Sequence, residues 1–254
     1  MLHFLRRVRQ NLITQNNLKT YALYGIGEIF LVVIGIMIAL ALDNHNKTRI
    51  EKEELKNYLQ KIAINVKSDL SEAERMLMGR TSQSALCAKA TTLIGNREFN
   101  HEAQKTITNA LFAMIIEQPI NFNRSGFESL KNSGHLQHLD DSNLENLLYA
   151  YYRASDKVVF EENSLQLWSN DLDLQLHKSG FFSEWLELEK RPNPSLDEAI
   201  GNYSEKLTKH EGHNIVLSIF YRGFLFTEFL TGFYEEQITS GGELIKAIDE
   251  YVKE

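Results

Sequence analysis

Two histidine pairs have the spacing that comes closest to a metal site. His135 and His138 are three residues apart, as are His210 and His213, and on a helix this spacing lets two imidazole nitrogens reach one ion. A zinc site needs a third or fourth ligand, and the chain contains neither an H-E-x-x-H pattern nor a pair of cysteines. A glycine beside each pair also interrupts the helix that would aim the rings. We expect surface or loop histidines and no bound metal.

The other residue types that perform chemistry are scattered. Cys87 is the single cysteine and lies among alanine and leucine residues of an expected helix, which predicts a buried, unreactive thiol. The sequence lacks a G-x-S-x-G elbow, a phosphate-binding loop and a dinucleotide fingerprint. The carboxylates follow helical patterns in which a solvated face accounts for them. We therefore expect a protein that is not an enzyme and that needs no cofactor.

Aromatic residues are densest in two places. Three tyrosines lie at positions 149, 151 and 152, and seven aromatic residues lie between Phe220 and Tyr234. Their spacing follows helical faces, so we expect most of them in the core. The alternative is a ligand pocket between bundle helices, with Arg222 as the polar group that orients an anionic ligand.

The composition predicts that helices position these residues. Three prolines in 254 residues leave few forced breaks, which disfavours an all-β fold. One cysteine cannot form an internal disulfide. The net charge of −7 argues against a nucleic-acid partner, which would require a basic face.

Charge divides the chain into three parts. Residues 1–20 carry four cations and no acid, residues 21–42 carry only Glu28, and a charge of −10 remains on residues 43–254. A basic head, an almost uncharged segment and an acidic body suggest a membrane boundary. We predict a short cytoplasmic tail at 1–20, a transmembrane helix at 21–42 and an extracytoplasmic helical domain at 43–254.

The segment 21–42 is long enough to cross a bilayer. At 1.5 Å per residue, 22 residues reach about 33 Å, against a hydrocarbon core about 30 Å thick. The alternative is a cleavable signal peptide, because Ala39-Leu40-Ala41 imitates a cleavage site. Tyr21 and Tyr24, as an interfacial belt, and a helical pattern that resumes after Asn46 favour the uncleaved anchor.

Lysine and arginine counts alone leave the orientation nearly tied, because four cations also follow the span at positions 47, 49, 52 and 56. A long acidic body is translocated largely regardless of its charge, whereas a short tail with four cations resists crossing. We therefore expect a bacterial inner-membrane protein with a cytoplasmic N-terminus and a periplasmic body.

Within the span, Glu28 is the one ionisable residue. One interpretation is that Glu28 has a function and faces a partner helix or a proton path. The alternative is that it lies near the lipid head groups and only adjusts the depth of the helix in the bilayer. Gly27, Gly35 and Ala39 recur on one stripe, where two helix backbones can approach closely. Association of two copies of the helix along this stripe is therefore one hypothesis, although small residues are common in transmembrane helices.

The same segment carries a resemblance. The run Gly27–Leu40, preceded by the basic FLRRVRQNL head, resembles the N-terminal signature of an uncharacterised family of Gram-negative bacterial single-span membrane proteins. Members continue with an N-x-W-N turn, in which this chain has His45 in place of Trp. The stretch Glu128–Gly134 resembles the family's second motif. The resemblance implies the single-span topology and supplies no catalytic residue.

Apolar spacing of three and four residues predicts the helices of the body. We expect them at 47–78, 82–94, 102–117 and 142–178, with 47–78 packing in a bundle rather than forming a coiled coil. Hydroxyl-carboxylate capping boxes are expected to start helices at Ser125, Ser142 and Ser195. Gly134 and Gly180 are natural stops, and Arg191–Pro194 marks a loop.

The segment 215–234 is the passage that would change the topology. It has the length of a second span, but Arg222 and Glu228 would each cost about 2.5–3.5 kcal/mol at the bilayer centre. We expect it to be the central buried helix of the body, with a second span as the alternative.

These observations predict an all-α protein with one N-terminal transmembrane helix followed by a multi-helix bundle. Its expected role is that of a scaffold, assembly partner or sensor component in the envelope, with the bilayer, a second copy or other envelope proteins as partners. A tail of about 20 residues is too short for a signalling domain, which favours the scaffold. The alternative is a membrane-anchored hydrolase with a His-based metal site.

Overall fold

A computed structural model describes residues 18–116, 120–188 and 203–253. Within these ranges the chain forms α-helices and two short 3₁₀ turns, and no strand. The all-α prediction is therefore confirmed, with a long apolar N-terminal helix followed by a helical bundle. The elements are α2 (Leu18–Gly95), α3 (His101–Ile115), α4 (Ser125–Ser133), a turn at His135–His138, α5 (Ser142–Lys178), α6 (Phe181–Leu188), a turn at Leu207–Lys209 and α8 (Gly212–Lys253).

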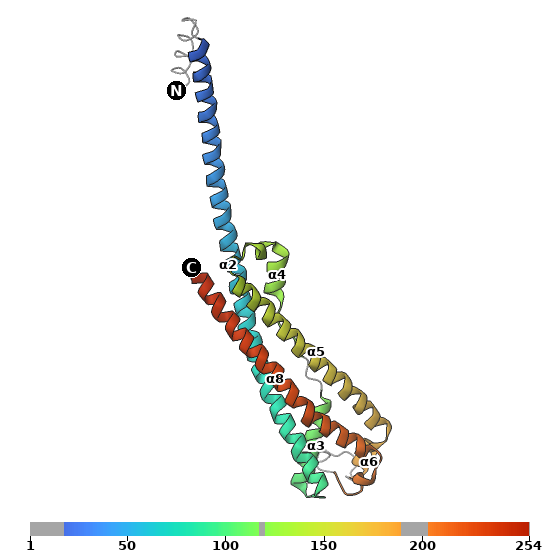
Figure 1. Cartoon of the computed structure of the whole chain (residues 1–254). Coiled ribbons are helices and arrows are strands. Elements are labelled where there is room, and N and C mark those ends of the chain that lie inside the picture. Colours follow the sequence, from blue (N-terminus) through green and yellow to red (C-terminus); the bar gives the residue numbers. More distant parts are fainter. Residues whose placement is uncertain (1–17, 117–119, 189–202, 254) are drawn as a thin grey trace. The chain divides into compact units, whose positions relative to one another are not determined.

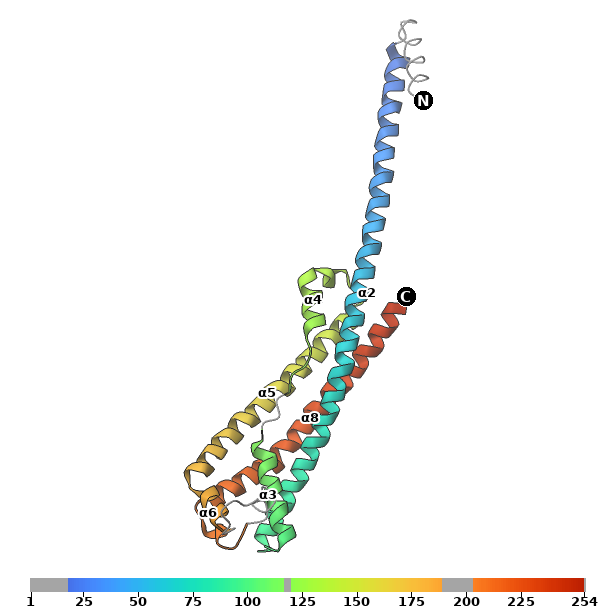
Figure 2. The same ribbon diagram turned by 180° about the vertical axis from the view of Figure 1, so that it is seen from behind.

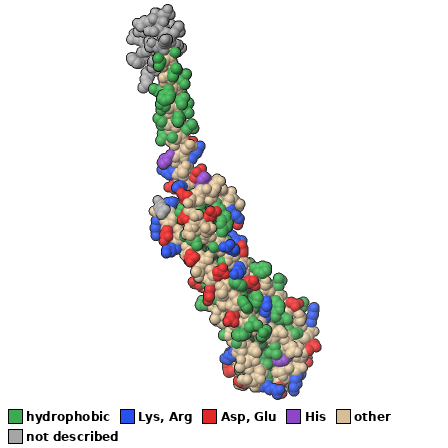
Figure 3. Space-filling model, viewed as in Figure 1, with side chains coloured by type: hydrophobic (Ala, Val, Ile, Leu, Met, Phe, Trp, Pro, Cys, Tyr) green, Lys and Arg blue, Asp and Glu red, His purple; other side chains and the backbone are tan. Residues whose placement is uncertain are grey.

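The chain divides into two compact units, residues 1–55 and 56–254, and α2 contributes to both. In the first unit, apolar side chains of α2 cover the face that Figure 3 shows, and the apolar side chains from Ile26 to Leu42 are exposed. The predicted end of the span at Leu42 falls inside this unit. In the second unit, α5, α8 and the part of α2 after Leu55 form a bundle, to which α3, α4 and α6 are added (Figures 1 and 2).

The bundle is built on a seven-residue repeat in each of its three long helices. Buried positions alternate in steps of three and four, the spacing that keeps one helix face toward its neighbours in a left-handed supercoil. Polar contacts show that α5 runs in the same direction as α2 and that α8 runs in the opposite direction. The positions of this repeat, all of them buried, are 59, 62, 66, 69, 73, 76, 80, 83, 87, 90 and 94 in α2; 144, 148, 151, 155, 158, 162, 165 and 169 in α5; and 216, 220, 223, 227, 230, 234, 237, 241, 244 and 248 in α8.

The structure corrects one expectation about α2 and confirms another. The helices predicted at 47–78 and 82–94 are one continuous helix. The part of this helix after Leu55 packs in a bundle, as predicted, through a regular buried repeat. Gly79 lowers helix stability by about 1 kcal/mol, but the buried positions Met76, Arg80 and Gln83 continue across it. Packing on both sides of the glycine therefore outweighs its weak helix propensity.

A fourth helix, α3, packs against the part of the bundle where α2 ends and α8 begins. Its buried residues Ile107, Leu111 and Met114 join one hydrophobic core with Cys87 and Phe220. The helix lies within one or two residues of the predicted bounds. Its start is set by Asn100, whose side-chain oxygen accepts a hydrogen bond from the Ala103 N–H at 3.0 Å.

α5 begins and ends at the predicted residues, Ser142 and Lys178, and α4 begins at the predicted Ser125, but the predicted hydroxyl caps neither helix. Asp141, rather than Ser142, caps α5, because its carboxylate accepts from two backbone N–H groups. At α4, the Ser125 N–H donates a hydrogen bond to the Asn123 side chain. The side chain of the N-cap residue, Arg124, forms no capping hydrogen bond. The predicted start at Ser195 and loop at 191–194 lie outside the described residues.

The predicted stops are confirmed. Gly134 ends α4 with φ of 78°, and Gly180 follows α5 with φ of 79°. Both values lie in the left-handed region, which glycine enters without the steric cost that a Cβ imposes.

Gly223 lies at a close approach between helices of the bundle, and we predict that Gly223→Ala destabilises the protein. A Cβ there would lie 2.6 Å from Met114 Sδ and 2.7 Å from Cys87 Sγ, so the core must shift, at an expected cost of about 1–3 kcal/mol. Chemical denaturation followed by circular dichroism measures the change in unfolding free energy.

Gly232→Ala in the same helix is the matched control. A Cβ at Gly232 meets nothing within 4 Å, so the better helix propensity of alanine should stabilise the protein by about 1 kcal/mol. Equal effects of the two substitutions would show that the close approach at Gly223 does not limit stability.

Candidate functional site

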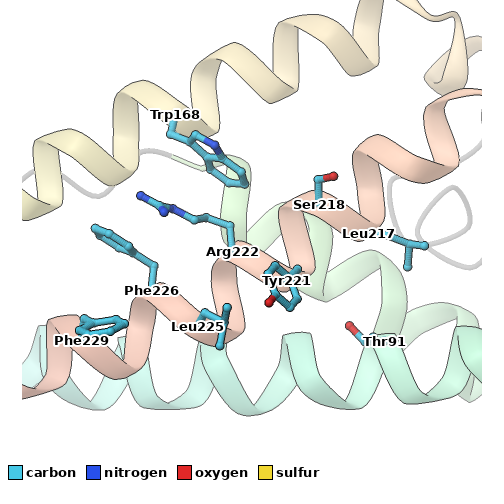
Figure 4. A pocket seen from close by; sticks show the side chains of 9 residues that line it. All are labelled: Thr91, Trp168, Leu217, Ser218, Tyr221, Arg222, Leu225, Phe226 and Phe229. Carbon is cyan, nitrogen blue, oxygen red and sulfur yellow. The ribbon is translucent and has the colours of Figure 1, made fainter.

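A groove of about 650 Å³ runs along the face of α8 that the bundle leaves open, and it contains Arg222. Trp168 of α5 and Thr91 of α2 lie on its two sides, with residues of α8 between them (Figure 4). Arg222 is the only charged side chain among the residues that line it. These residues are Thr91, Trp168, Leu217, Ser218, Tyr221, Arg222, Leu225, Phe226 and Phe229.

The Arg222 guanidinium lies against two aromatic rings. Its central carbon is 3.8 Å from the centroid of the Phe226 ring and 5.2 Å from that of Trp168, which places both contacts within cation–π range. Figure 4 shows the side chain between these two residues. Arg222 Nε is buried without a hydrogen-bond partner. The groove therefore combines a largely apolar wall with one cation that aromatic rings hold in place.

The aromatic cluster of α8 is only partly in the core, which corrects the expectation that most of it is buried. Phe220 and Tyr234 are buried, but Tyr221 and Phe229 are 66% and 68% exposed and Phe224 is 42% exposed. The segment 215–234 is thus a bundle helix with one buried and one open face. α8 is also long and apolar enough to cross a membrane by length and composition, although a third of its most apolar window is buried in the bundle.

On α5 the tyrosines divide in a similar way. Tyr151 and Tyr152 are buried, and Tyr149 is exposed. Tyr152 stacks on Phe127 of α4 with ring centroids 4.3 Å apart, so this cluster attaches α4 to the bundle.

Neither histidine pair forms a metal site among the described residues. No group of three or more potential ligands gathers there. His135 and His138 lie in the 3₁₀ turn after α4, with ring centroids 6.0 Å apart. His210 Nδ1 accepts a hydrogen bond from the Gly212 N–H, and His213 Nδ1 hydrogen-bonds the Tyr203 hydroxyl.

Cys87 is fully buried in the core between α2, α3 and α8. Burial raises the pKa of its thiol to about 12, because the low-dielectric core disfavours the thiolate. The prediction of a buried, unreactive thiol agrees with this environment.

The predicted membrane residues lie on the exposed part of α2. The side chains of Glu28 and Ala39 are exposed, and a Cβ added to Gly27 or Gly35 would meet nothing within 4 Å. Self-association along the stripe and a role for Glu28 stay predictions.

Two buried polar layers, which the sequence pattern did not predict, join the three long helices. In one layer, Arg80 of α2 binds Glu162 of α5 through two hydrogen bonds of 3.0 and 2.5 Å, and the Tyr234 hydroxyl of α8 donates to the same carboxylate at 2.7 Å. Arg80 and Glu162 are only 5% and 4% exposed. Gln83 accepts from Arg80 and donates to the Ala113 carbonyl, which extends this layer to α3.

The second layer is centred on Asp69 of α2. Its carboxylate accepts from the Asn123 N–H at 3.0 Å and from the Tyr151 hydroxyl at 3.1 Å, and Gln237 of α8 donates to the Tyr151 oxygen at 3.2 Å. Burial raises the pKa of Asp69, opposed by these hydrogen bonds. The signal for both layers was present in the sequence, since Asp69, Arg80 and Glu162 occupy positions of the seven-residue repeat.

Comparison with protein-family models, with curated proteins and with solved structures finds no match to this chain.

We predict that Glu162→Gln destabilises the bundle by about 3–5 kcal/mol, because it leaves the Arg80 charge buried without its counter-ion. Glu236→Gln is the control. It removes an exposed pair with Lys157 (3.1 Å), for which a loss below about 1 kcal/mol is expected. Denaturant unfolding of the two variants measures both values, and a small loss for Glu162→Gln would mean that the layer contributes little stability.

His213 predicts a pH dependence of stability. Burial lowers its pKa in the folded protein below the usual value of 6.5. Its stabilising contribution is therefore complete above the unfolded-state pKa and is lost as pH falls, because the unfolded chain then binds a proton that the folded chain does not. His213→Gln should reduce the drop in Tm between about pH 7.5 and pH 5.5. Substitution of the exposed His101 by Gln is the control, and equal pH profiles for all three proteins would contradict the assignment.

Proposed function

We propose that this chain is a membrane-anchored, non-catalytic helical protein of the bacterial inner membrane that acts as an assembly partner, scaffold or sensor component. The observation that carries the proposal is the apolar stretch of α2, in which the described side chains from Ile26 to Leu42 are exposed around the whole helix. Exposure of apolar surface to water costs a free energy of about 25 cal/mol per Å², and burial of the same surface in a bilayer removes this cost. As part of the same proposal, the chain belongs to the single-span family whose N-terminal motif it resembles.

The continuity of α2 supports an anchor over a cleaved signal peptide. The helix passes through Ala39-Leu40-Ala41 without a break and extends to Gly95. Signal peptidase would have to cut within this helix. An uncleaved anchor keeps the apolar segment and the bundle in one chain.

The polar layers support a structural role for the bundle. Two layers of hydrogen bonds with buried charge specify how the helices align, as expected for a rigid support. The open aromatic face of α8 supports a role in binding, because exposed apolar groups surrounded by polar residues mark interaction sites. These two features together support a scaffold or sensor component.

Reporter fusions test the membrane topology. Alkaline phosphatase joined to the C-terminus should be active, since it needs the oxidising periplasm to form its disulfides, whereas a green fluorescent protein there should be dark after export. The protein should also resist extraction from membranes at alkaline pH. An inactive phosphatase with a bright fluorescent fusion would contradict the orientation, and extraction into the soluble fraction would contradict the anchor.

A pair of variants tests whether the exposed segment is what inserts. Ile34→Arg with Ile38→Arg should abolish insertion, because each arginine costs about 2.5–3.5 kcal/mol at the bilayer centre. Ile64→Arg is the control, because Ile64 is 68% exposed on the same helix within the second unit. Its fractionation should match that of the unmodified protein.

Metal analysis of the purified protein tests the alternative function. Stoichiometric zinc would favour the metal-dependent hydrolase over the non-catalytic protein.

A further inference from the structure

The groove on α8 contains one cationic side chain, Arg222, among largely apolar residues, and the described residues provide no counter-ion for it. Three arginines of the body pair with carboxylates: Arg75 with Glu72, Arg80 with Glu162 and Arg124 with Asp156. In the described part of the chain, Arg222 has aromatic contacts but no ion pair. Carboxylates are abundant in a chain with a net charge of −7, yet none of the described carboxylates lies within ion-pair distance of this guanidinium, which leaves it available to an anion from outside.

The aromatic rings hold the guanidinium in position before any ligand arrives. Arginine normally loses rotamer freedom when it binds, and stacking against Trp168 and Phe226 reduces that loss. Nε is buried, whereas the terminal nitrogens are not among the buried unpaired atoms. These terminal nitrogens are the groups that can donate two charge-assisted hydrogen bonds to a carboxylate.

The other residues that line the groove are mostly apolar, and they favour an anion that also has an apolar part. Leu225, Phe229 and the ring of Tyr221 give the groove an apolar surface on the side toward α2, whereas Arg222 points toward Trp168 (Figure 4). The volume of about 650 Å³ is within the range of small-molecule sites. A fully polar anion would leave this surface in water, and a neutral apolar molecule would leave the cation unpaired.

We infer that the groove binds an amphiphilic carboxylate, with the carboxylate on Arg222 and an alkyl or aryl body along Leu225 and Phe229. This inference goes beyond the proposed membrane anchoring and does not depend on it, because every lining residue belongs to the second unit.

Tryptophan fluorescence provides a direct test. The chain contains two tryptophans, Trp168 in the groove and Trp185 in the core, where it is 5% exposed. The full-length protein in phosphatidylcholine nanodiscs is titrated with 12-bromododecanoate, whose bromine quenches indole fluorescence on contact. Saturable quenching is expected, and Trp168→Phe should abolish it. The uncharged 12-bromododecanol should bind at least about tenfold more weakly, since it lacks the charge-assisted hydrogen bonds.

Two arginine variants locate the interaction. Arg222→Gln should weaken binding of 12-bromododecanoate about tenfold or more, and Arg222→Lys should retain part of the affinity because it keeps the charge. Arg153→Gln, at an exposed position of α5, is the control and should bind like the unmodified protein. Circular dichroism checks that each variant is folded, and the comparison of acid with alcohol on the unmodified protein needs no variant.

Four results would overturn the inference. The first is equal quenching by the acid and the alcohol, and the second is unchanged affinity in a folded Arg222→Gln protein. The third is quenching by brominated phosphatidylcholine in the nanodisc without added acid, which would assign the groove to bilayer lipid. Absence of quenching by the acid would likewise reject the site.

Discussion

The body of this protein depends on one buried layer of charge, in which Arg80, Glu162 and Tyr234 join three helices. A buried ion pair rarely adds net stability, because removing the two charges from water costs about as much as their attraction returns. Its effect is on alignment. A slip of any one helix by a few residues would separate the charges inside an apolar core, so the layer penalises every register except the observed one.

The second layer applies the same constraint further along the bundle. Asp69 and Tyr151 are eleven residues before Arg80 and Glu162 on their own helices, so the two layers lie at equal spacings along α2 and α5. Gln237 and Tyr234 of the antiparallel α8 complete them. Gly223 then allows α8 to approach α2 and α3 closely, and Gly241 allows it to approach α2 and α5.

That close approach also explains why α8 presents an aromatic face outward. Once Phe220, Gly223, Thr227 and Leu230 occupy the inward positions of the repeat, the residues between them point away from the core. Tyr221 and Phe229 are therefore exposed, although their types favour burial. The Arg222 groove results from this excess of large apolar side chains over inward positions.

Sequence and tertiary structure each determined a different part of this protein. Apolar length, proline scarcity and glycine stops predicted the helical class, α5, the glycine ends of α4 and α5 and the apolar N-terminal segment, because these depend on local backbone preferences and on composition. They did not predict the regular repeat of α2, since Asp69, Arg80 and Gln83 are polar residues at buried positions, where their partners belong to α5 and α3. The groove was anticipated only as an alternative centred on Arg222, and its wall from α2 and α5 depends on residues distant in the chain. Local patterns state which residues are apolar, but only the packing of helices decides which polar groups find partners inside and which aromatic groups are left outside.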